Sequence, residues 1–174
     1  RRRCRTFYAP LHVATNAPTL VAPVDAAKEA TLEVAFTLEA AAQFDQAGCM
    51  VYCDDDHWCK AGIEVVDGSP RLSVVVTNGG WSDWSAAPWD STAARLRVHK
   101  VHPDQGDAVV VEAAPIDTND WSMVRIAALR SDRQTWLMGV VAAAPQAQRG
   151  CKATFHAVKI TDRLPTVHDA NLPS

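Results

Sequence analysis

Alternation of apolar and polar residues at every second position constrains this 174-residue chain more than any other feature. In the run 31–39, Leu32, Val34, Phe36 and Leu38 fall on one side and mostly polar residues fall on the other. Similar patterns return at 72–77, 95–99, 107–113, 122–128, 135–142 and 152–160. About ten such runs, separated by Gly, Pro, Asp and Asn, predict an antiparallel all-β fold, either a sandwich or a barrel.

The length and composition indicate one ordinary globular domain. We expect a single β-sandwich domain over 1–160 and an extended C-terminal tail over 161–174. The net charge of −3 gives no electrostatic reason to expect nucleic acid or an anionic membrane as a partner. The basic residues at 1–5 are more typical of a solvated end than of a binding patch. The chain starts without Met, which leaves a removed upstream segment open.

Cysteine usage bears on the cellular compartment. The five cysteines are Cys4, Cys49, Cys53, Cys59 and Cys151, an odd number without the spacing of a disulfide framework. We therefore expect reduced thiols and a cytoplasmic protein. A bridge between Cys53 and Cys59, facing each other across a hairpin, is the less favoured alternative.

The clearest local signal is Asp67-Gly68 between two alternating runs, which predicts a β-hairpin. A two-residue loop pairs Val66 with Ser69 and places Glu64 opposite Arg71. The pairing continues with Gly62 opposite Ser73, Lys60 opposite Val75 and Trp58 opposite Thr77. A register that is shifted by one residue would bury charged side chains among Leu72, Val74 and Val76, so we reject it.

The predicted hairpin has one apolar face for the core and one mixed face that we expect to be wet. The wet face carries Trp58, Lys60, Glu64, Ser73 and Thr77, with a shallow gap at Gly62. An aromatic ring beside a gap flanked by hydrogen-bonding groups suits a sugar ring. A plain polar outer face, a partner surface, and a face covered by the N-terminal strands remain open alternatives.

Three tryptophans follow the hairpin closely. Trp81, Trp84 and Trp89 come after Gly79-Gly80, which marks a loop. One of these rings could cap the open end of the core. Alternatively, Trp81 or Trp84 forms a wall of the proposed site, and Asp83 hydrogen-bonds its own turn.

Four motifs in order resemble the "regulation of enolase" protein family. They are Asp45-Gln46-Ala47-Gly48, the segment Trp58 to Glu64 (WxKxGxE), the segment Ser73 to Thr77 (SVVVT) and the segment Ser82 to Ser85 (SDWS), and the similarity extends from about Cys4 to Ile160. The resemblance implies a concanavalin-like jelly roll, so the expected fold is an antiparallel two-sheet β-sandwich of that kind. It also implies a role linked to enolase and carbon metabolism, and it supplies no catalytic residues.

Hydrolysis of a sugar bond needs two carboxylates at a defined separation. The predicted wet face offers only Glu64, although Asp45 or Asp83 could approach it in space. The acidic run Asp54-Asp55-Asp56-His57 is more typical of a charged hairpin tip than of a Ca²⁺ loop. The sequence therefore predicts neither a catalytic residue, nor a metal ligand, nor a cofactor.

We expect a non-catalytic binding or regulatory module whose face holds a saccharide or sugar-derived metabolite. A protein-interaction regulator, for example of a glycolytic enzyme, is the close alternative, and a hydrolase is the remote one. The candidate ligand-binding residues are Gln46, Trp58, Lys60, Glu64, Ser73, Thr77, Trp81, Asp83, Trp84 and Arg97.

Overall fold

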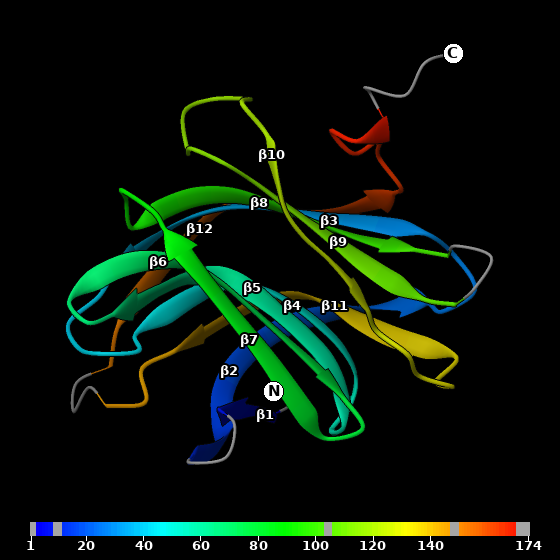
Figure 1. Cartoon of the computed structure of the whole chain (residues 1–174), viewed down its shortest axis with the longest axis horizontal. Coiled ribbons are helices and arrows are strands. Elements are labelled where there is room, and N and C mark those ends of the chain that lie inside the picture. The colour runs from blue at the N-terminus through cyan, green and yellow to red at the C-terminus, as the bar shows by residue number, and fades with distance from the viewer. Residues whose placement is uncertain (1–2, 9–11, 103–105, 147–149, 170–174) are drawn as a thin grey trace.

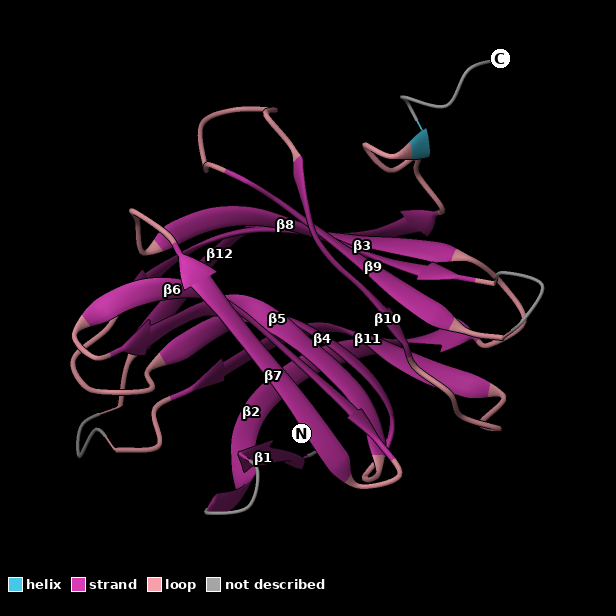
Figure 2. Cartoon of the chain, viewed as in Figure 1, coloured by secondary structure: helices cyan, strands magenta, loops and turns pink. Residues whose placement is uncertain are grey.

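Two antiparallel sheets make up the molecule in the computed structural model, which describes residues 3–8, 12–102, 106–146 and 150–169 (Figures 1 and 2). The seven-stranded sheet has the order β1-β2-β11-β4-β5-β6-β7, and the five-stranded sheet has the order β10-β9-β8-β3-β12. The strands are β1 (Arg3–Tyr8), β2 (His12–Asp25), β3 (Ala30–Glu39), β4 (Gln46–Asp54), β5 (His57–Val66), β6 (Ser69–Asn78), β7 (Trp81–Pro88), β8 (Ala93–Val101), β9 (Ala108–Ala114), β10 (Ser122–Ala128), β11 (Thr135–Ala143) and β12 (Lys152–Asp162). The predicted all-β sandwich is confirmed.

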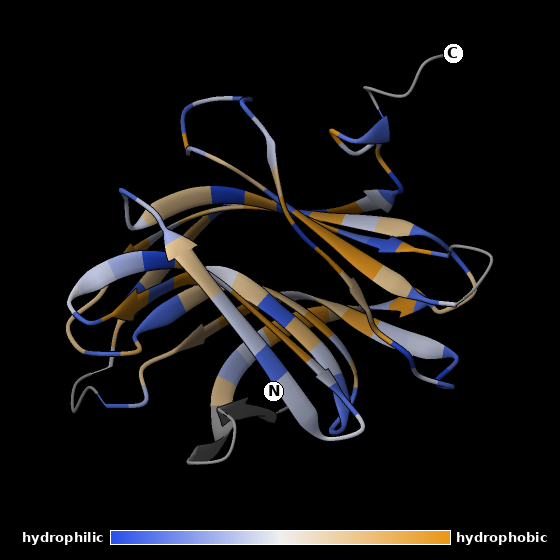
Figure 3. Cartoon of the chain, viewed as in Figure 1, coloured by the Kyte–Doolittle hydropathy of each residue, from blue (hydrophilic) through white to orange (hydrophobic). Residues whose placement is uncertain are grey.

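The main core lies between the two sheets, where Figure 3 shows the hydrophobic strands facing each other. Leu32, Val34 and Phe36 on β3 are fully buried against this core, as the alternation in the sequence requires. Ala61 and Ile63 face them from the other sheet. Removing these apolar side chains from water at about 25 cal/mol per Å² is the main force that holds the layers together.

The hairpin of β5 and β6 has the register that the sequence predicts. Val66 pairs with Ser69, Gly62 with Ser73 and Trp58 with Thr77. Asp67 and Gly68 form the two-residue turn, and both have positive φ, as a turn of this length demands.

The seven-stranded sheet curls so far that its two edge strands, β1 and β7, approach each other. The face of this sheet that points away from the five-stranded sheet therefore lies inside the curl, and we call it the concave face. Met50, Trp58, Val75 and Val141 on this face pack with Ala17 of β2 into a second, smaller hydrophobic cluster.

Our expectation that this face is wet was therefore wrong. Lys60, Glu64 and Thr77 are all buried. Alternation along one strand reports two faces of different polarity, but it carries no information on what folds back over the polar one. Of the alternatives we considered, cover by the N-terminal part of the chain fits best, because Ala17 joins the cluster.

Three further expectations concern the chain as a whole. Cys49, Cys53, Cys59 and Cys151 are free thiols, so no bridge joins Cys53 to Cys59. Within the described ranges, no helix has the length and apolar character needed to cross a membrane. Of the predicted tail, residues 161–162 still belong to β12, residues 163–169 follow it, and residues 170–174 lie outside the described ranges.

Candidate functional site

A pair of glycines forms the floor of the candidate site on the concave face. Gly48 on β4 lies directly opposite Gly62 on β5. A Cβ atom added to Gly48 would lie 2.1 Å from the backbone oxygen of Ala61, and one added to Gly62 would lie 2.1 Å from that of Ala47. The two strands approach so closely that only glycine fits, and the same absence of side chains leaves the middle of the face bare.

Polar side chains surround this floor and are joined by hydrogen bonds. The ammonium of Lys60 donates to Oε1 of Gln46. Lys60 and Gln46 lie on adjacent strands, on opposite sides of the glycine pair, so the lysine side chain spans the bare floor. The amide of Gln46 also donates to the carbonyl of Phe44 at 2.8 Å and approaches Oε1 of Glu64 at 3.5 Å.

Glu64 connects this half of the network to the other side of the floor. The hydroxyl of Ser73 donates to Oε2 of Glu64 at 2.7 Å, and the indole Nε1 of Trp84 donates to the Ser73 oxygen at 2.9 Å. The result is a chain of five side chains across β4, β5, β6 and β7, which we call the Glu64 network: Gln46, Lys60, Glu64, Ser73 and Trp84.

The Glu64 network borders a small, partly open hollow with room for about one water molecule. Its lining combines four network members (Gln46, Lys60, Glu64 and Ser73) with Ala47, Gly62, Ile63 and Val141. The exposed lining of the hollow is mainly apolar, with the donors and acceptors of the Glu64 network at its margin, and the hollow is much smaller than the ~300–1,000 Å³ of a typical small-molecule site.

Burial changes the acidity of Glu64. Loss of water raises the pKa of this carboxyl to about 7, and the hydrogen bonds from Ser73 and Trp84 lower it only in part. Near neutral pH the group is therefore present both as carboxylate and as carboxylic acid. It can accept hydrogen bonds in one form and donate one in the other.

Two further predicted residues lie deeper on the same concave face. Trp58 is fully buried in the small hydrophobic cluster, so its ring is not a wall of the hollow. Its buried indole Nε1 has no hydrogen-bond partner in the structure. Thr77 is also buried, and its hydroxyl shares a hydrogen bond of 2.8 Å with Ser82.

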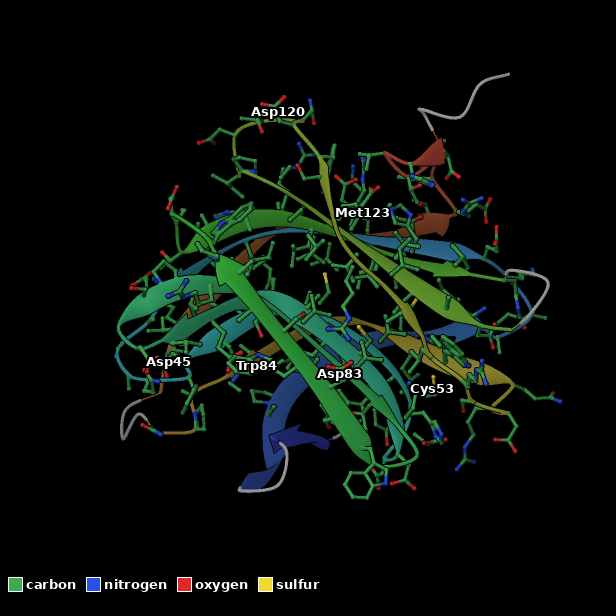
Figure 4. The ribbon with its side chains drawn as sticks, in the orientation of Figure 1. Asp45, Cys53, Asp83, Trp84, Asp120 and Met123 are labelled. Carbon is green, nitrogen blue, oxygen red and sulfur yellow. The ribbon has the colours of Figure 1, made fainter. Side chains whose placement is uncertain are left out.

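Trp81 and Asp83 do not join the network. Consecutive residues of a strand point to opposite faces, so Trp81 and Asp83 lie on the other side of β7 from Trp84 (Figure 4 labels Asp83 and Trp84). Asp83 accepts a hydrogen bond of 2.8 Å from Arg125 of β10 and so ties the two sheets together. The side chain of Trp81 is 83% exposed.

Arg97 belongs to the other sheet altogether. Its Nε donates to Glu33 at 2.8 Å, and its guanidinium lies 4.0 Å from the ring centre of Trp121. Arg95 joins the same cluster from the neighbouring outward position of β8. The two arginines hold the pKa of Glu33 below its usual value, against the opposing effect of burial. Arg97 is therefore a structural residue of the five-stranded sheet.

The acidic run of the sequence forms the tip of the β4–β5 hairpin. Asp54 accepts hydrogen bonds from Nδ1 of His57 at 2.8 Å and from the backbone N–H of Asp56 at 3.0 Å. Its second carboxylate oxygen accepts hydrogen bonds from Ser131 and Arg133. These bonds hold the tip against the loop before β11. Among the described residues, no group of three or more His, Cys, Asp or Glu side chains is arranged to hold a metal ion.

Sequence reasoning missed Ala47, Gly48, Ile63 and Val141 as residues of the site. Gly48 lies in the Asp45–Gly48 motif, and its direct pairing with Gly62 could have been found by extending the hairpin to β4. Val141 comes from β11, which is distant in the sequence, and no local signal connects it with Glu64.

Comparisons with known proteins agree with this architecture. The model of the family described as "Protein of unknown function (DUF1349)" matches residues 4–163. "Regulation of enolase protein 1" from Saccharomyces cerevisiae is 39% identical over 127 residues, which is 72% of this chain and 61% of that protein. The chain thus matches about three fifths of the length of that relative.

Solved structures carry the same fold. A functionally unknown protein from Saccharomyces cerevisiae superimposes with a TM-score of 0.78 at 32% identity, covering 95% of this chain and 84% of that one. The GH43 BlXynB protein from Bacillus licheniformis gives 0.70 at 14% identity, over 84% of this chain and 30% of that one. A legume lectin-like domain from Entamoeba histolytica superimposes with a TM-score of 0.56 at 8% identity, covering 93% of this chain and 88% of that one. At such low identity the last two likenesses concern the fold alone.

Proposed function

Since this chain belongs to the DUF1349 family of proteins of unknown function, we propose from its own geometry that it is a non-catalytic regulatory module that binds a saccharide or sugar-derived metabolite. The ligand would lie at the mouth of the hollow on the concave face, with one polar group reaching the Glu64 network. The name of the yeast relative, "Regulation of enolase protein 1", agrees with a regulatory role.

The observation that carries this proposal is the convergence of the Glu64 network on one hollow. A sugar hydroxyl donates one hydrogen bond and accepts others, so it is recognised best by donors and acceptors that alternate in space. Lys60 supplies a hydrogen-bond donor, and the Ser73 hydroxyl supplies both a donor and an acceptor. Glu64 can donate or accept because its pKa is about 7. The indole of Trp84, 42% exposed, adds an aromatic surface at the margin.

A binding role is favoured over hydrolysis because, among the described residues, the two acids considered as partners of Glu64 are engaged elsewhere. Asp83 faces the other sheet, where Arg125 holds it. Asp45 turns one carboxylate oxygen toward the backbone N–H groups of Ala41 and Ala42, at 2.7 and 2.9 Å. Both carboxylates therefore serve the fold, whereas glycosidases place two acids about 5–10 Å apart across the bond that is cleaved.

Protein binding is the second candidate function, and Trp81 is the observation that favours it. This large ring is 83% exposed on the edge strand β7, where an aromatic side chain is suited to anchor a partner. The partner would be an enzyme of carbon metabolism such as a glycolytic enzyme, and the site of action would be the cytoplasm.

Calorimetric titration with a panel of neutral sugars, sugar acids and sugar phosphates tests the proposal. We expect saturable binding of at least one class, weakened about tenfold or more in Glu64→Gln, which corresponds to about 1.4 kcal/mol. Glu39→Gln is the matched control, because Glu39 is exposed and bonds only to Lys152 among the interactions seen. The absence of saturable binding across the panel, or equal affinity in Glu64→Gln, would contradict the proposal. A partner captured by the native chain and lost in Trp81→Ala would favour the second candidate instead.

A further inference from the structure

A second buried polar cluster lies on the outer face of the five-stranded sheet, far from the Glu64 network. Thr31 on β3 pairs directly with His99 on β8, and Glu112 on β9 lies diagonally from His99, two residues beyond its register partner Val110. The side chains of Thr31, His99 and Glu112 have no exposed surface. Oγ1 of Thr31 lies 2.9 Å from Nδ1 of His99, and Nε2 of His99 lies 3.1 Å from Oε2 of Glu112. In a β-sandwich, the face of a sheet that points away from the core normally exposes such groups to water.

Residues 163–169, which we call the strap, are what buries them. The strap follows β12 and lies on the outer side of β3 and β9, as the red segment of Figure 1. The backbone N–H of Leu164 donates to Oγ1 of Thr31 at 2.8 Å, and that of Val167 donates to Oε1 of Glu112 at 2.6 Å. The strap is thus attached to the sheet through the two ends of the Thr31–His99–Glu112 cluster.

The partners of His99 fix its protonation state while the strap is closed. Nε2 faces a carboxylate, so Nε2 carries the hydrogen and donates it to Glu112. Nδ1 then accepts the hydroxyl hydrogen of Thr31, and the Thr31 oxygen remains free to accept from Leu164. Every group in this arrangement has a partner only when the imidazole is neutral. A second proton on Nδ1 would leave the Thr31 hydroxyl hydrogen without its acceptor.

The charged and titratable groups around His99 do not reverse this preference. They are Glu112 on β9, Arg97 on β8, Glu33 on β3, Lys159 on β12, and Arg163, His168 and Asp169 on the strap. Burial lowers the pKa of His99 most, Arg97 and Arg163 lower it further, and Glu112 opposes them. Glu33 is engaged by Arg95 and Arg97, and Asp169 is engaged by Arg163.

We propose that the strap is a pH-sensitive closure of the five-stranded sheet, which opens when His99 takes up a proton. An imidazole freed of the strap regains water and its ordinary affinity for a proton, so the open form binds protons more readily than the closed form. The closed form is therefore fully favoured above about pH 6.5 and loses stability as the pH falls below that value. Because only one proton is taken up, the equilibrium constant for closing falls by at most about tenfold per pH unit.

Amide hydrogen exchange by NMR, corrected for the intrinsic effect of pH, measures the closure at the two amides that make it. In the full chain we expect the protection of Leu164 and Val167 to fall as the pH drops from 7.5 to 5, by up to about tenfold per unit below pH 6.5, while amides of β4 and β5 stay protected. In His99→Gln this pH dependence should disappear. His156→Gln is the matched control, because His156 is exposed on β12, and it should behave as the unmodified chain does.

A second variant leaves the buried histidine untouched. Thr166 caps the short turn that follows it by accepting the N–H of Asp169, so position 167 is the first residue of that turn, where proline fits well. Val167→Pro therefore removes the N–H that Glu112 accepts. We expect the NMR-detected pKa of His99 to rise in this variant toward its ordinary value. Protection of Leu164 and Val167 that does not change with pH in the full chain, or an unchanged His99 pKa in Val167→Pro, would overturn the proposal.

Discussion

Two buried glutamates, one on each sheet, show how differently the same side chain is used in this fold. Glu112 is held beneath the strap, where a backbone N–H and an imidazole each donate to one of its two oxygens. Glu64 receives a short hydrogen bond from Ser73, a contribution from the Trp84 indole and a long approach of 3.5 Å from Gln46, and it borders a hollow. Glu112 thus belongs to a closed structural cluster, whereas Glu64 retains capacity to bind something else.

The concave face depends on its glycine floor, which has no counterpart around Glu112. Gly62→Ala places a Cβ against the backbone of β4 and should lower the free energy of unfolding by about 3 kcal/mol. Gly68→Ala is the control: it has φ of +75° but open space, so only the backbone strain of about 1 kcal/mol is expected. Urea unfolding measures both. Equal effects of the two substitutions would show that the close approach at Gly62 does not matter.

Replacing each glutamate by glutamine separates the two clusters most directly. Glutamine at position 112 has one carbonyl oxygen for two donors, so its NH₂ group would face either His99 or Val167. We expect Glu112→Gln to lose about 2 kcal/mol of stability at pH 7. Glutamine at position 64 keeps an oxygen for Ser73 and cannot ionise, so Glu64→Gln should not destabilise the chain at pH 7 and should relieve the cost, on the order of a few kcal/mol, of ionising a desolvated carboxyl. The midpoints of urea unfolding compare the two, and a larger loss in Glu64→Gln would reverse our assignment.

The sequence was sufficient to predict the register of the β5–β6 hairpin, but it was insufficient to predict which part of the chain covers the concave face. Period two and Asp67-Gly68 define the register from Trp58 to Thr77, because both depend on residues close together in the chain. The burial of Lys60 and Glu64 depends on the curl that brings β1 to β7, which local patterns do not encode. The placement of Trp84 beside Ser73 was predictable from the strand that follows the hairpin, and alternation should also have placed Asp83 on the other face.

The region around Thr31, His99 and Glu112 was missed for a similar reason. The hydrogen-bonded residues Thr31 and His99 are 68 positions apart in the sequence. Leu164 of the strap is 133 positions from its partner Thr31. Thr31, His99 and Glu112 each lie on the polar side of an alternating run, where exposure is the ordinary expectation. Arg97 was predicted as a ligand-binding residue beside Glu64, but it lies on β8 of the five-stranded sheet, and the sheet to which a strand belongs could not be identified from the sequence.

The pH dependence of Glu64 follows from its desolvation. Its folded pKa of about 7 lies above the ordinary value of 4.5, so the folded chain binds more protons than the unfolded chain between these values. The contribution of this group to stability is therefore fully present below pH 4.5 and is lost as the pH rises through 7. By pH 8 the loss is about 3 kcal/mol, and Glu64→Gln should remove this part of the pH profile.

A titration of the Glu64 side-chain carboxyl by ¹³C NMR tests the central claim, that this group is desolvated and incompletely partnered on the concave face. The structure predicts a midpoint near pH 7. A midpoint near the ordinary 4.5 would mean that the carboxyl is hydrated or fully paired as an anion, and it would contradict the assignment of this face as the binding site.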